Sequence, residues 1–578
     1  MGLQEQCGLL TLPPEIQTKI LSHLAVFFGK SSIHAVLKTC KQLYEIALPL
    51  TVKVFRNTVP WPGTHGPCSP ARNIQFLRYI LITKPWLAKH VKTAILGRFS
   101  TDHRGGADGN ETAQGQESID REELAVYQQY IQLRLRQLAS GDTASWCDSW
   151  VEDLGNGTSD AQIALILLAC PNIRTLYFEV SDSNHFVRLL RMVRDISARN
   201  DQPGERGSGQ DDGHCTKTSV PLCNLQEVFH EQGGFAERQQ DFHIEASELF
   251  ALPRLRIYEA LGVQGTETAA ASFETLPLRA SPVEQITLSN SFCTWPIWHI
   301  LGSCKELKKF EFSWYKPPWL EAPNLLMPVD IMNAVWIHRH TLEYLYLDLY
   351  EELDHRWDPD ESDYERLYLG MRLREMRSLK TLVVGMQALT GMLASKPRGH
   401  HNMPLKVEGA PRMVDCLPDS LQCITIHSCG EAILDQLQEL VNCAWQGRLK
   451  KLSYICVLYD DWRANQKEIW EWHQKFPKRP EGGQPTITAA ASRTKDASMH
   501  DSFGVFSLSD KGPFNAISKI YAPHLRRQYL ERRMNIDYWN AEYNYQDDPN
   551  LFDDTYDKGY SLVWLPKSVR EAVEIEYY

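Results

Sequence analysis

Long apolar segments are missing from this chain. The longest uninterrupted apolar run, Ile163–Cys170, has 8 residues, whereas a helix that spans a bilayer needs about 20. The first residues contain no cationic segment followed by a long apolar one, so the sequence shows no secretory signal. We therefore expect no membrane partner, and a location in the cytoplasm, the nucleus or both.

Paired cysteines are also missing. The 14 cysteines are scattered, no two have the C-x-x-C spacing, and Cys423 and Cys429, the closest pair, are 6 residues apart. This spacing, without paired histidines nearby, argues against a zinc knuckle and against a disulfide framework. We expect a protein of a reducing compartment that needs no metal and no cofactor.

The chain has no excess of positive charge and no signature of an enzyme. It carries 72 acidic and 61 basic side chains, a net charge of −11, so nucleic acid is not an expected partner. The sequence contains no H-E-x-x-H, G-x-S-x-G or G-x-G-x-x-G motif and no phosphate-binding loop. Disorder as the general state is excluded, because 43% of the residues are hydrophobic and 16 are tryptophan.

Two amphipathic helices are predicted near the N-terminus. Pro13 and Pro14 stand where a helix can begin, and the apolar stripe that follows is predicted to end at Gly29. A second helix is predicted from Ser31 or Ser32 to Pro49. Two such helices cannot bury both of their apolar faces alone, so we expect them to pack against something else.

This segment closely resembles an F-box, in the form common in fungal proteins, which continues with a C-K-x-L-Y-x-I-A-x-P-L helix, here Cys40–Leu50. The resemblance implies docking onto the Skp-type adaptor of a cullin–RING ubiquitin ligase. Tyr44 stands in place of the tryptophan of the better-known form. The alternative is an ordinary helical cap on the domain that follows. The expected adaptor-binding residues are Leu12, Pro13, Pro14, Ile16, Ile20, Leu21, Leu24, Leu37 and Cys40.

A short pattern, apolar-x-x-apolar-x-apolar, recurs between residues 165 and 460. The nine units are Ile173/Leu176/Phe178, Leu225/Val228/His230, Leu255/Tyr258/Ala260, Val283/Ile286/Leu288, Leu307/Phe310/Phe312, Leu342/Leu345/Leu347, Leu379/Leu382/Val384, Leu421/Ile424/Ile426 and Leu449/Leu452/Tyr454. Intervals of 24, 28 and 30 residues between units resemble those of leucine-rich repeats, and longer intervals contain inserts. Chance matches in a leucine-rich α/β protein are the alternative.

The repeats predict an α/β fold, namely an irregular solenoid with a curved parallel sheet inside and helices outside. Helical stretches precede several strands: 162–169, 329–338, 365–376 and 432–444. Cys170 and Cys304 each lie three residues before the first apolar position of a unit. This matches the cysteine-containing repeats found with F-boxes, and we expect both cysteines to be small core residues.

The predicted plan has five parts. These are an F-box-like module (9–56), a linker with an insert and atypical first repeats (57–160), the repeat solenoid (161–475), a flexible insert (476–510) and a C-terminal cap (511–578). The last 42 residues, from Asp537, hold 10 acidic, 3 basic and 10 aromatic side chains. They are predicted either to cover the last repeat or to act as a lid or an acidic docking segment.

As a whole the chain resembles a fungal F-box protein with leucine-rich repeats. The resemblance implies a substrate-recognition subunit of an SCF-type ubiquitin ligase, which catalyses nothing itself and holds a target protein near the ubiquitin carrier. Target contacts are expected from strand positions predicted to face solvent: Tyr177, Thr287, Glu311, Tyr346, Val383 and Thr425. One alternative is a leucine-rich-repeat interaction scaffold without a ligase role. Another is an enzyme of a type that these motifs do not reveal.

Overall fold

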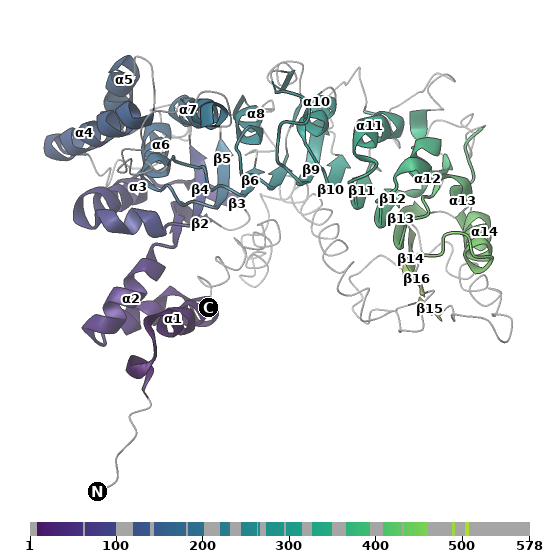
Figure 1. Ribbon diagram of the computed structural model, residues 1–578, viewed down its shortest axis with the longest axis horizontal. Coiled ribbons are helices and arrows are strands. Elements are labelled where there is room, and N and C mark those ends of the chain that lie inside the picture. The colour runs from purple at the N-terminus through teal and green to yellow at the C-terminus, as the bar shows by residue number, and fades with distance from the viewer. Residues whose placement is uncertain are drawn as a thin grey trace, which may run out of the picture. The chain divides into compact units, whose positions relative to one another are not determined.

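The structure of the chain is a computed structural model (Figure 1). It describes residues 8–61, 64–99, 119–138, 144–180, 183–200, 220–231, 244–262, 264–265, 273–274, 276–293, 296–314, 326–349, 366–392, 409–429, 433–452, 454–459, 488–491 and 503–507. The described residues fall into two compact units, which divide between Glu259 and Ala260. Of the insert expected at 101–120, only residues 119 and 120 are described, and the insert expected at 201–219 and the acidic segment from Asp537 on lie outside the described residues.

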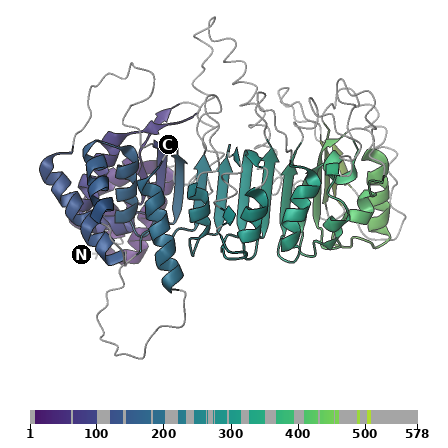
Figure 2. The ribbon, with the colours of Figure 1, turned by 90° about the horizontal axis from the view of Figure 1, so that it is seen from above.

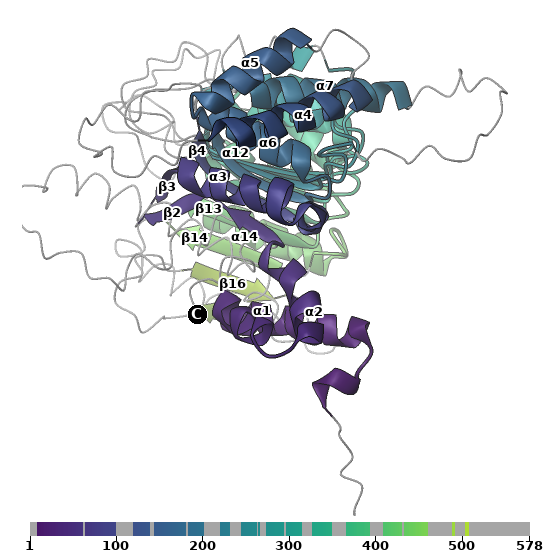
Figure 3. The same cartoon turned by 90° about the vertical axis from the view of Figure 1, so that its left-hand side faces the viewer.

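The N-terminal helices of the first unit differ from the predicted pair. A 3-10 turn, Leu9–Thr11, precedes α1 (Pro14–Leu37), and α2 spans Lys41–Thr51. The predicted end of the first helix at Gly29 is wrong, because α1 continues through it. A glycine inside a helix costs only about 1 kcal/mol, and the chain turns instead at Lys38–Cys40. Figure 3 shows α1 and α2 side by side.

The strands of the first unit form a parallel ladder that begins directly after α2. The ladder strands are β1 (Val54–Arg56), β4 (Thr93–Phe99), β5 (Thr175–Val180), β6 (Glu227–Glu231) and β7 (Ile257–Leu261), and the unit boundary falls within β7. Phe55 pairs with Ala94, Ala94 with Leu176, and Leu176 with Val228. Strands β2 (Thr58–Trp61) and β3 (Thr64–Cys68) form an antiparallel hairpin, and β3 also pairs with β4.

Helices cover one face of this ladder (Figure 2). They are α3 (Pro70–Leu77), a π-helical turn (Arg78–Thr83), a 3-10 turn (Pro85–His90), α4 (Arg121–Leu138), α5 (Ala144–Gly155), α6 (Ser159–Ala169), α7 (His185–Asn200) and α8 (Ile244–Phe250). The predicted helix 162–169 lies within α6. Helices α4 and α5 were not predicted, since their range had been assigned to a linker and an insert.

A chain of buried amides joins the first strand to the helices. Asn57 Nδ2 donates to Asn73 Oδ1 at 3.0 Å, and Asn73 Nδ2 donates to Gln162 Oε1 at 3.1 Å. Asn57 Oδ1 accepts the backbone N–H of Gly97 at 2.8 Å. Because buried amides need partners, this chain fixes the loop after β1 to β4, α3 and α6.

The second unit contains a second parallel ladder. Its strands are β9 (Gln285–Cys293), β10 (Lys309–Trp314), β11 (Tyr344–Asp348), β12 (Thr381–Gly385), β13 (Cys423–Cys429) and β14 (Tyr454–Tyr459), with a short β8 (Gln264–Gly265) beside β9. Each strand from β9 to β13 pairs in parallel with the next. The predicted parallel α/β fold of the solenoid type is thereby confirmed.

The last predicted repeat is out of register by three residues. Ile455 pairs with Ile424, so the final unit is Leu452/Ile455/Val457 and the predicted Leu449/Leu452/Tyr454 is wrong. Leu449 has φ 51 and belongs to the turn before the strand. After β14 come β15 (Thr488–Ala491) and β16 (Phe503–Ser507), which pair antiparallel, β16 also with β14. These strands differ from the flexible insert expected at 476–510.

The helices of the second unit are short (Figure 1). They are α10 (Pro296–Ser303), α11 (Pro328–Val335), a 3-10 turn (Trp336–His338), a 3-10 turn (Met371–Glu375), α12 (Met386–Thr390), α13 (Met413–Cys416) and α14 (Ile433–Trp445). The predicted helices 329–338 and 432–444 are present within a residue or two. The predicted helix 365–376 is reduced to a 3-10 turn that follows Gly370, whose φ is 72.

Candidate functional site

The inner faces of α1 and α2 form a small closed core. Leu21, Ile33, Leu43 and Ala47 are buried in it. Leu24, Leu37 and Cys40 are partly buried and pack against this core. Four of the predicted adaptor-binding residues, Leu21, Leu24, Leu37 and Cys40, therefore serve the packing of the two helices.

A buried glutamine, which sequence reasoning missed, fastens the segment before α1. Gln17 is fully buried, and its Nε2 donates to the carbonyl oxygens of Leu12 at 2.7 Å and Leu10 at 3.2 Å. Gln42 Nε2 donates to Gln17 Oε1 at 3.2 Å, so α2 takes part in the same network. A buried amide that lost these partners would be costly, and the segment is thereby held in one place.

The outer face of the same helix is apolar and exposed. Ile16 and Ile20, at i and i+4 on one side of α1, are 45% and 41% exposed, and Leu10 is 49% exposed. Pro13 and Pro14 are also exposed, and Leu12 is half-buried. We call Leu10, Pro13, Ile16 and Ile20 the α1 ridge. Of the predicted adaptor-binding residues, Pro13, Pro14, Ile16 and Ile20 are thus the accessible ones.

The ridge belongs to a helical pair that is attached directly to the repeats of its unit. The carbonyl oxygen of Lys53, just after α2, accepts the N–H groups of Lys92 at 2.9 Å and Thr93 at 3.1 Å. Tyr44 is hydrogen-bonded to Lys84, and this bond raises the pKa of the Lys84 ammonium. Tyr44 therefore anchors α2 to Lys84, directly before the 3-10 turn Pro85–His90.

The predicted target-contact residues share one face of the ladders but are buried. In the second unit Thr287 pairs with Glu311, Glu311 with Tyr346, Tyr346 with Val383, and Val383 with Thr425. In the first unit Tyr177 stands at the equivalent position. All six are buried, so the prediction that they face solvent is wrong.

Contacts along the ladder account for part of this burial. Adjacent strands are about 4.8 Å apart, so side chains at the same register cover one another. The rings of Tyr177 and Phe229 stack with centroids 4.6 Å apart. Thr287 Oγ1 donates to Glu311 Oε2 at 3.1 Å, and Glu311 also pairs with Lys309 at 3.0 Å. Within the described chain, residues of this row therefore contact their neighbours along the sheet.

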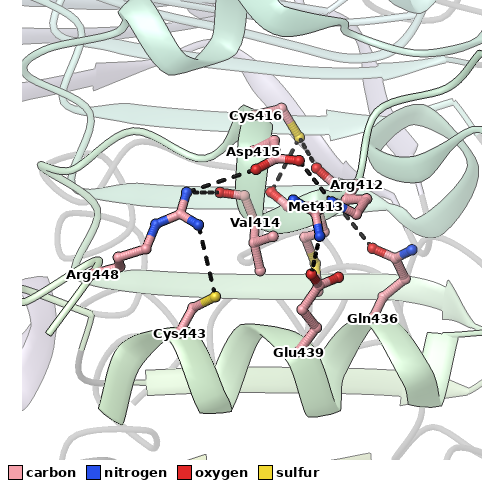
Figure 4. Close-up of polar contacts among 9 residues, drawn as sticks. All are labelled: Arg412, Met413, Val414, Asp415, Cys416, Gln436, Glu439, Cys443 and Arg448. Carbon is pink, nitrogen blue, oxygen red and sulfur yellow. Dashed lines mark hydrogen bonds and ion pairs between the residues drawn. The ribbon is translucent and has the colours of Figure 1, made fainter. Parts of the chain in front are cut away.

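A charged cluster joins α13 to α14 in the last repeats (Figure 4). Arg412 bridges Asp415 at 2.8 Å and Glu439 at 2.5 Å. The Arg412 guanidinium holds the pKa of the Asp415 carboxyl below its usual range, and Arg448 adds to this effect. Because its charges pair with one another, the cluster stabilises the helix contact and offers no open site.

The cysteines at the turns between helix and strand are inert. Cys170 and Cys304 are fully buried, and burial raises the pKa of both thiols, that of Cys304 to about 12. A thiol of such pKa stays protonated at neutral pH and is a poor nucleophile. Among the residues that the structure describes, no cluster of three or more His, Cys, Asp or Glu side chains has the geometry to hold a metal ion.

The comparison with protein families agrees with this geometry. The family model described as "Leucine-rich repeat domain" matches residues 68–466. The chain belongs to the leucine-rich-repeat family. Its match begins at residue 68, in β3, and so includes the atypical first repeat as well as the regular ones. None of the curated proteins matches the chain.

Family membership sets the coarse function. Leucine-rich-repeat domains bind other proteins through extended repeat surfaces and are typically not catalytic. The chain is therefore a protein-interaction scaffold in the broad sense. Within the described ranges, every helix is too short or too polar to cross a membrane.

Proposed function

We propose that the chain is the substrate-recognition subunit of an SCF-type cullin–RING ubiquitin ligase. In this proposal the α1 ridge docks onto a Skp-type adaptor, while the repeats bind a target protein in the cytoplasm or nucleus. The chain itself makes and breaks no bond. It acts by holding the target's lysine near the charged ubiquitin carrier that other subunits supply.

The observation that carries the proposal is the exposed apolar face of α1. The pair α1/α2 already has a closed core on its inner side. Ile16 and Ile20 lie outside this core, and the exposed part of their apolar surface adds nothing to the stability of the fold. Two exposed isoleucines one turn apart, beside an exposed proline and leucine, form an exposed apolar patch of the kind that marks a protein-interaction site. The resemblance of this segment to an F-box names the partner.

The test is the affinity of the purified full-length chain for a fungal Skp-type adaptor. The variant Ile16→Asp/Ile20→Asp places two charges on the ridge, and we expect binding to weaken by roughly 100-fold or more. Leu21→Asp is unsuitable for this purpose, because Leu21 is buried in the core of the pair and its replacement would unfold the module.

A matched control removes exposed apolar side chains of another helix in the same unit. Val126 and Leu133 of α4 are 41% and 54% exposed, and Val126→Asp/Leu133→Asp should bind the adaptor as the wild type does. Absence of adaptor binding by the wild type, or equal binding by the ridge variant, would contradict the proposal.

The second candidate is an interaction scaffold without a ligase role. The family match, which covers the repeats and not the residues before 68, is the observation that favours it. In that case α1 and α2 only cap the ladder at β1. Retained target binding together with no adaptor binding would identify this function.

A further inference from the structure

Four of the five residues that enter the parallel strands of the first unit are cationic, and the fifth is a glutamine. Each of the five stands immediately before the first residue of a strand: Lys53, Lys92, Arg174, Gln226 and Arg256. Their backbones are joined in sequence: the N–H of Lys92 donates to Lys53 O at 2.9 Å, and that of Arg174 to Lys92 O at 2.7 Å. The N–H of Gln226 donates to Arg174 O at 2.7 Å, and that of Arg256 to Gln226 O at 2.8 Å. We call these five residues the basic row.

The equivalent row of the second unit is neutral. Glu284, Lys308, Glu343, Lys380 and Gln422 are joined by the same backbone bonds, each 2.8 Å long. Here acids and bases alternate, and they pair: Lys308 with Glu284 and Lys380 with Glu343, both at 2.7 Å. The backbone hydrogen bonds are the same in both rows, and the ion pairs of the second row show that they bring side chains of neighbouring strands into contact. Where the charges are alike, the arrangement is repulsive.

The basic row is accessible and lacks acidic partners at its centre. Lys53, Arg174, Gln226 and Arg256 are exposed, and Lys92 is half-buried. Among the described residues, Lys53, Lys92 and Arg174 make no ion pair with an acidic side chain. Two further exposed cations, Lys89 and Arg254, lie within a few residues of the row. Arg254 donates to Asn224 Oδ1 at 2.6 Å, a neutral acceptor.

Neighbouring positive charges help to lower the pKa values of two residues in or beside the row, Lys92 and His90. Burial lowers the pKa of Lys92, and the neighbouring Arg174 lowers it further. Burial also lowers the pKa of His90, and Lys89 and Lys92 add to this effect. An anionic segment laid along the row would relieve this repulsion.

The chain carries a segment of matching charge. Residues 537–557 contain seven Asp and Glu and no Lys or Arg. At about 3.3 Å per residue these 21 residues reach roughly 70 Å when extended, whereas the row spans about 19 Å, four strand spacings.

We propose that the basic row is the docking surface for the chain's own acidic segment, residues 537–557. Because the segment is covalently attached, its effective concentration at the row exceeds that of a free acidic peptide. A docked segment lies beside Lys53, two residues after α2, at the junction of the helical pair and the repeats. This inference stands apart from the ligase proposal and does not depend on it.

Zero-length cross-linking of the full-length chain tests the proposal. A carbodiimide activates a carboxyl group, and a lysine amine in contact with it then forms an amide. At about 50 mM salt, where charges act over more than about 10 Å, mass spectrometry should find Lys53, Lys89 or Lys92 joined to acids of 537–557. Arg174→Glu leaves these lysines in place as reporters and should lower the yield roughly fivefold.

The control changes the same charge elsewhere. Arg377 is exposed in the second unit, and Arg377→Glu should leave the yield unchanged. Circular dichroism should show that both variants are folded. The absence of links between these lysines and 537–557, or an equal yield in Arg174→Glu, would overturn the proposal. So would links that join light to heavy chains in a mixture of isotope-labelled and unlabelled protein, because the occupant would then be a second copy.

Discussion

Helices α1 and α6 are both rich in apolar residues, yet they have opposite surroundings. Every residue of α6 from Asp160 to Ala169 is buried, because α3, α5 and α7 all contact it. Helix α1 packs chiefly against α2, and Ile16 and Ile20 stay exposed. The repeats therefore complete their own core, whereas the helical pair has an apolar face left over. The sequence already hints at this difference, because Ile163–Cys170 is an uninterrupted apolar run, typical of a helix that is buried on all sides, whereas apolar and polar residues are mixed in the first half of α1.

The sharpest way to break this comparison is to truncate one side chain on each helix. Leu167→Ala in α6 should lower the free energy of unfolding by about 2–5 kcal/mol, because it leaves a cavity in a closed core. Ile20→Ala should change it by clearly less, about 1 kcal/mol or below, because the residue is 41% exposed and its loss leaves no closed cavity. Urea unfolding followed by tryptophan fluorescence gives both values, and equal losses would show that the Ile16/Ile20 face of α1 is also part of a closed core.

The comparison extends to a buried carboxylate in α6. The Oδ2 atom of Asp160 accepts the N–H groups of His185 at 2.7 Å and Asn184 at 2.9 Å, and Oδ1 accepts that of Phe186 at 3.2 Å. These N–H groups at the start of α7 have no partner within the helix itself, and Asp160 accepts them instead. Asp160→Ala should therefore lower the free energy of unfolding by about 2–3 kcal/mol, and hydrogen exchange should be faster at 184–186. An unchanged exchange rate there would refute this role.

The repeats were predictable from the sequence because one repeat corresponds to one step of the ladder. Leu345 and Leu382, for example, pair in register as their places in the pattern require. The last unit was misplaced because Leu449 fits the pattern while its backbone turns. The continuation of α1 through Gly29 was missed because one glycine is a weak helix breaker. The burial of Tyr177 and Thr287 depends on neighbours far along the chain, which alternation within a strand cannot reveal.

Gln17 offers a smaller perturbation of the helical pair. Gln17→Leu keeps a buried side chain of similar size but removes the hydrogen bonds from Gln17 Nε2 to Leu10 O and Leu12 O. We expect the free energy of unfolding to fall by about 1–2 kcal/mol. The carbonyl oxygen of Leu10 would then keep only the hydrogen bond from Gln42 Nε2, at 3.3 Å, so under the ligase proposal adaptor binding should weaken by roughly 5-fold while Ile16 and Ile20 remain. Calorimetric titration with the adaptor measures this. Binding equal to that of the wild type would show that Leu10 is not part of the contact.

The smallest expected effect concerns the charged cluster of the last repeats, a surface that is complete without a partner. The pKa of Asp415 is lowered in the folded chain by its hydrogen bond to Arg412, so its contribution to stability is present above about pH 4 and is lost as the pH falls through the lowered value. Asp415→Asn should thus be slightly less stable than the wild type at pH 7 and equal to it near pH 2. Urea midpoints at both pH values test this, and a difference that persists in acid would contradict it.

The central claim is that the α1 ridge is left exposed for another protein. Hydrogen exchange of the full-length chain, with and without a Skp-type adaptor, addresses it most directly. We predict that the adaptor slows exchange within residues 9–24 and leaves the exchange of α6 unchanged. Exchange within 9–24 that is the same with saturating adaptor as without it would contradict the account.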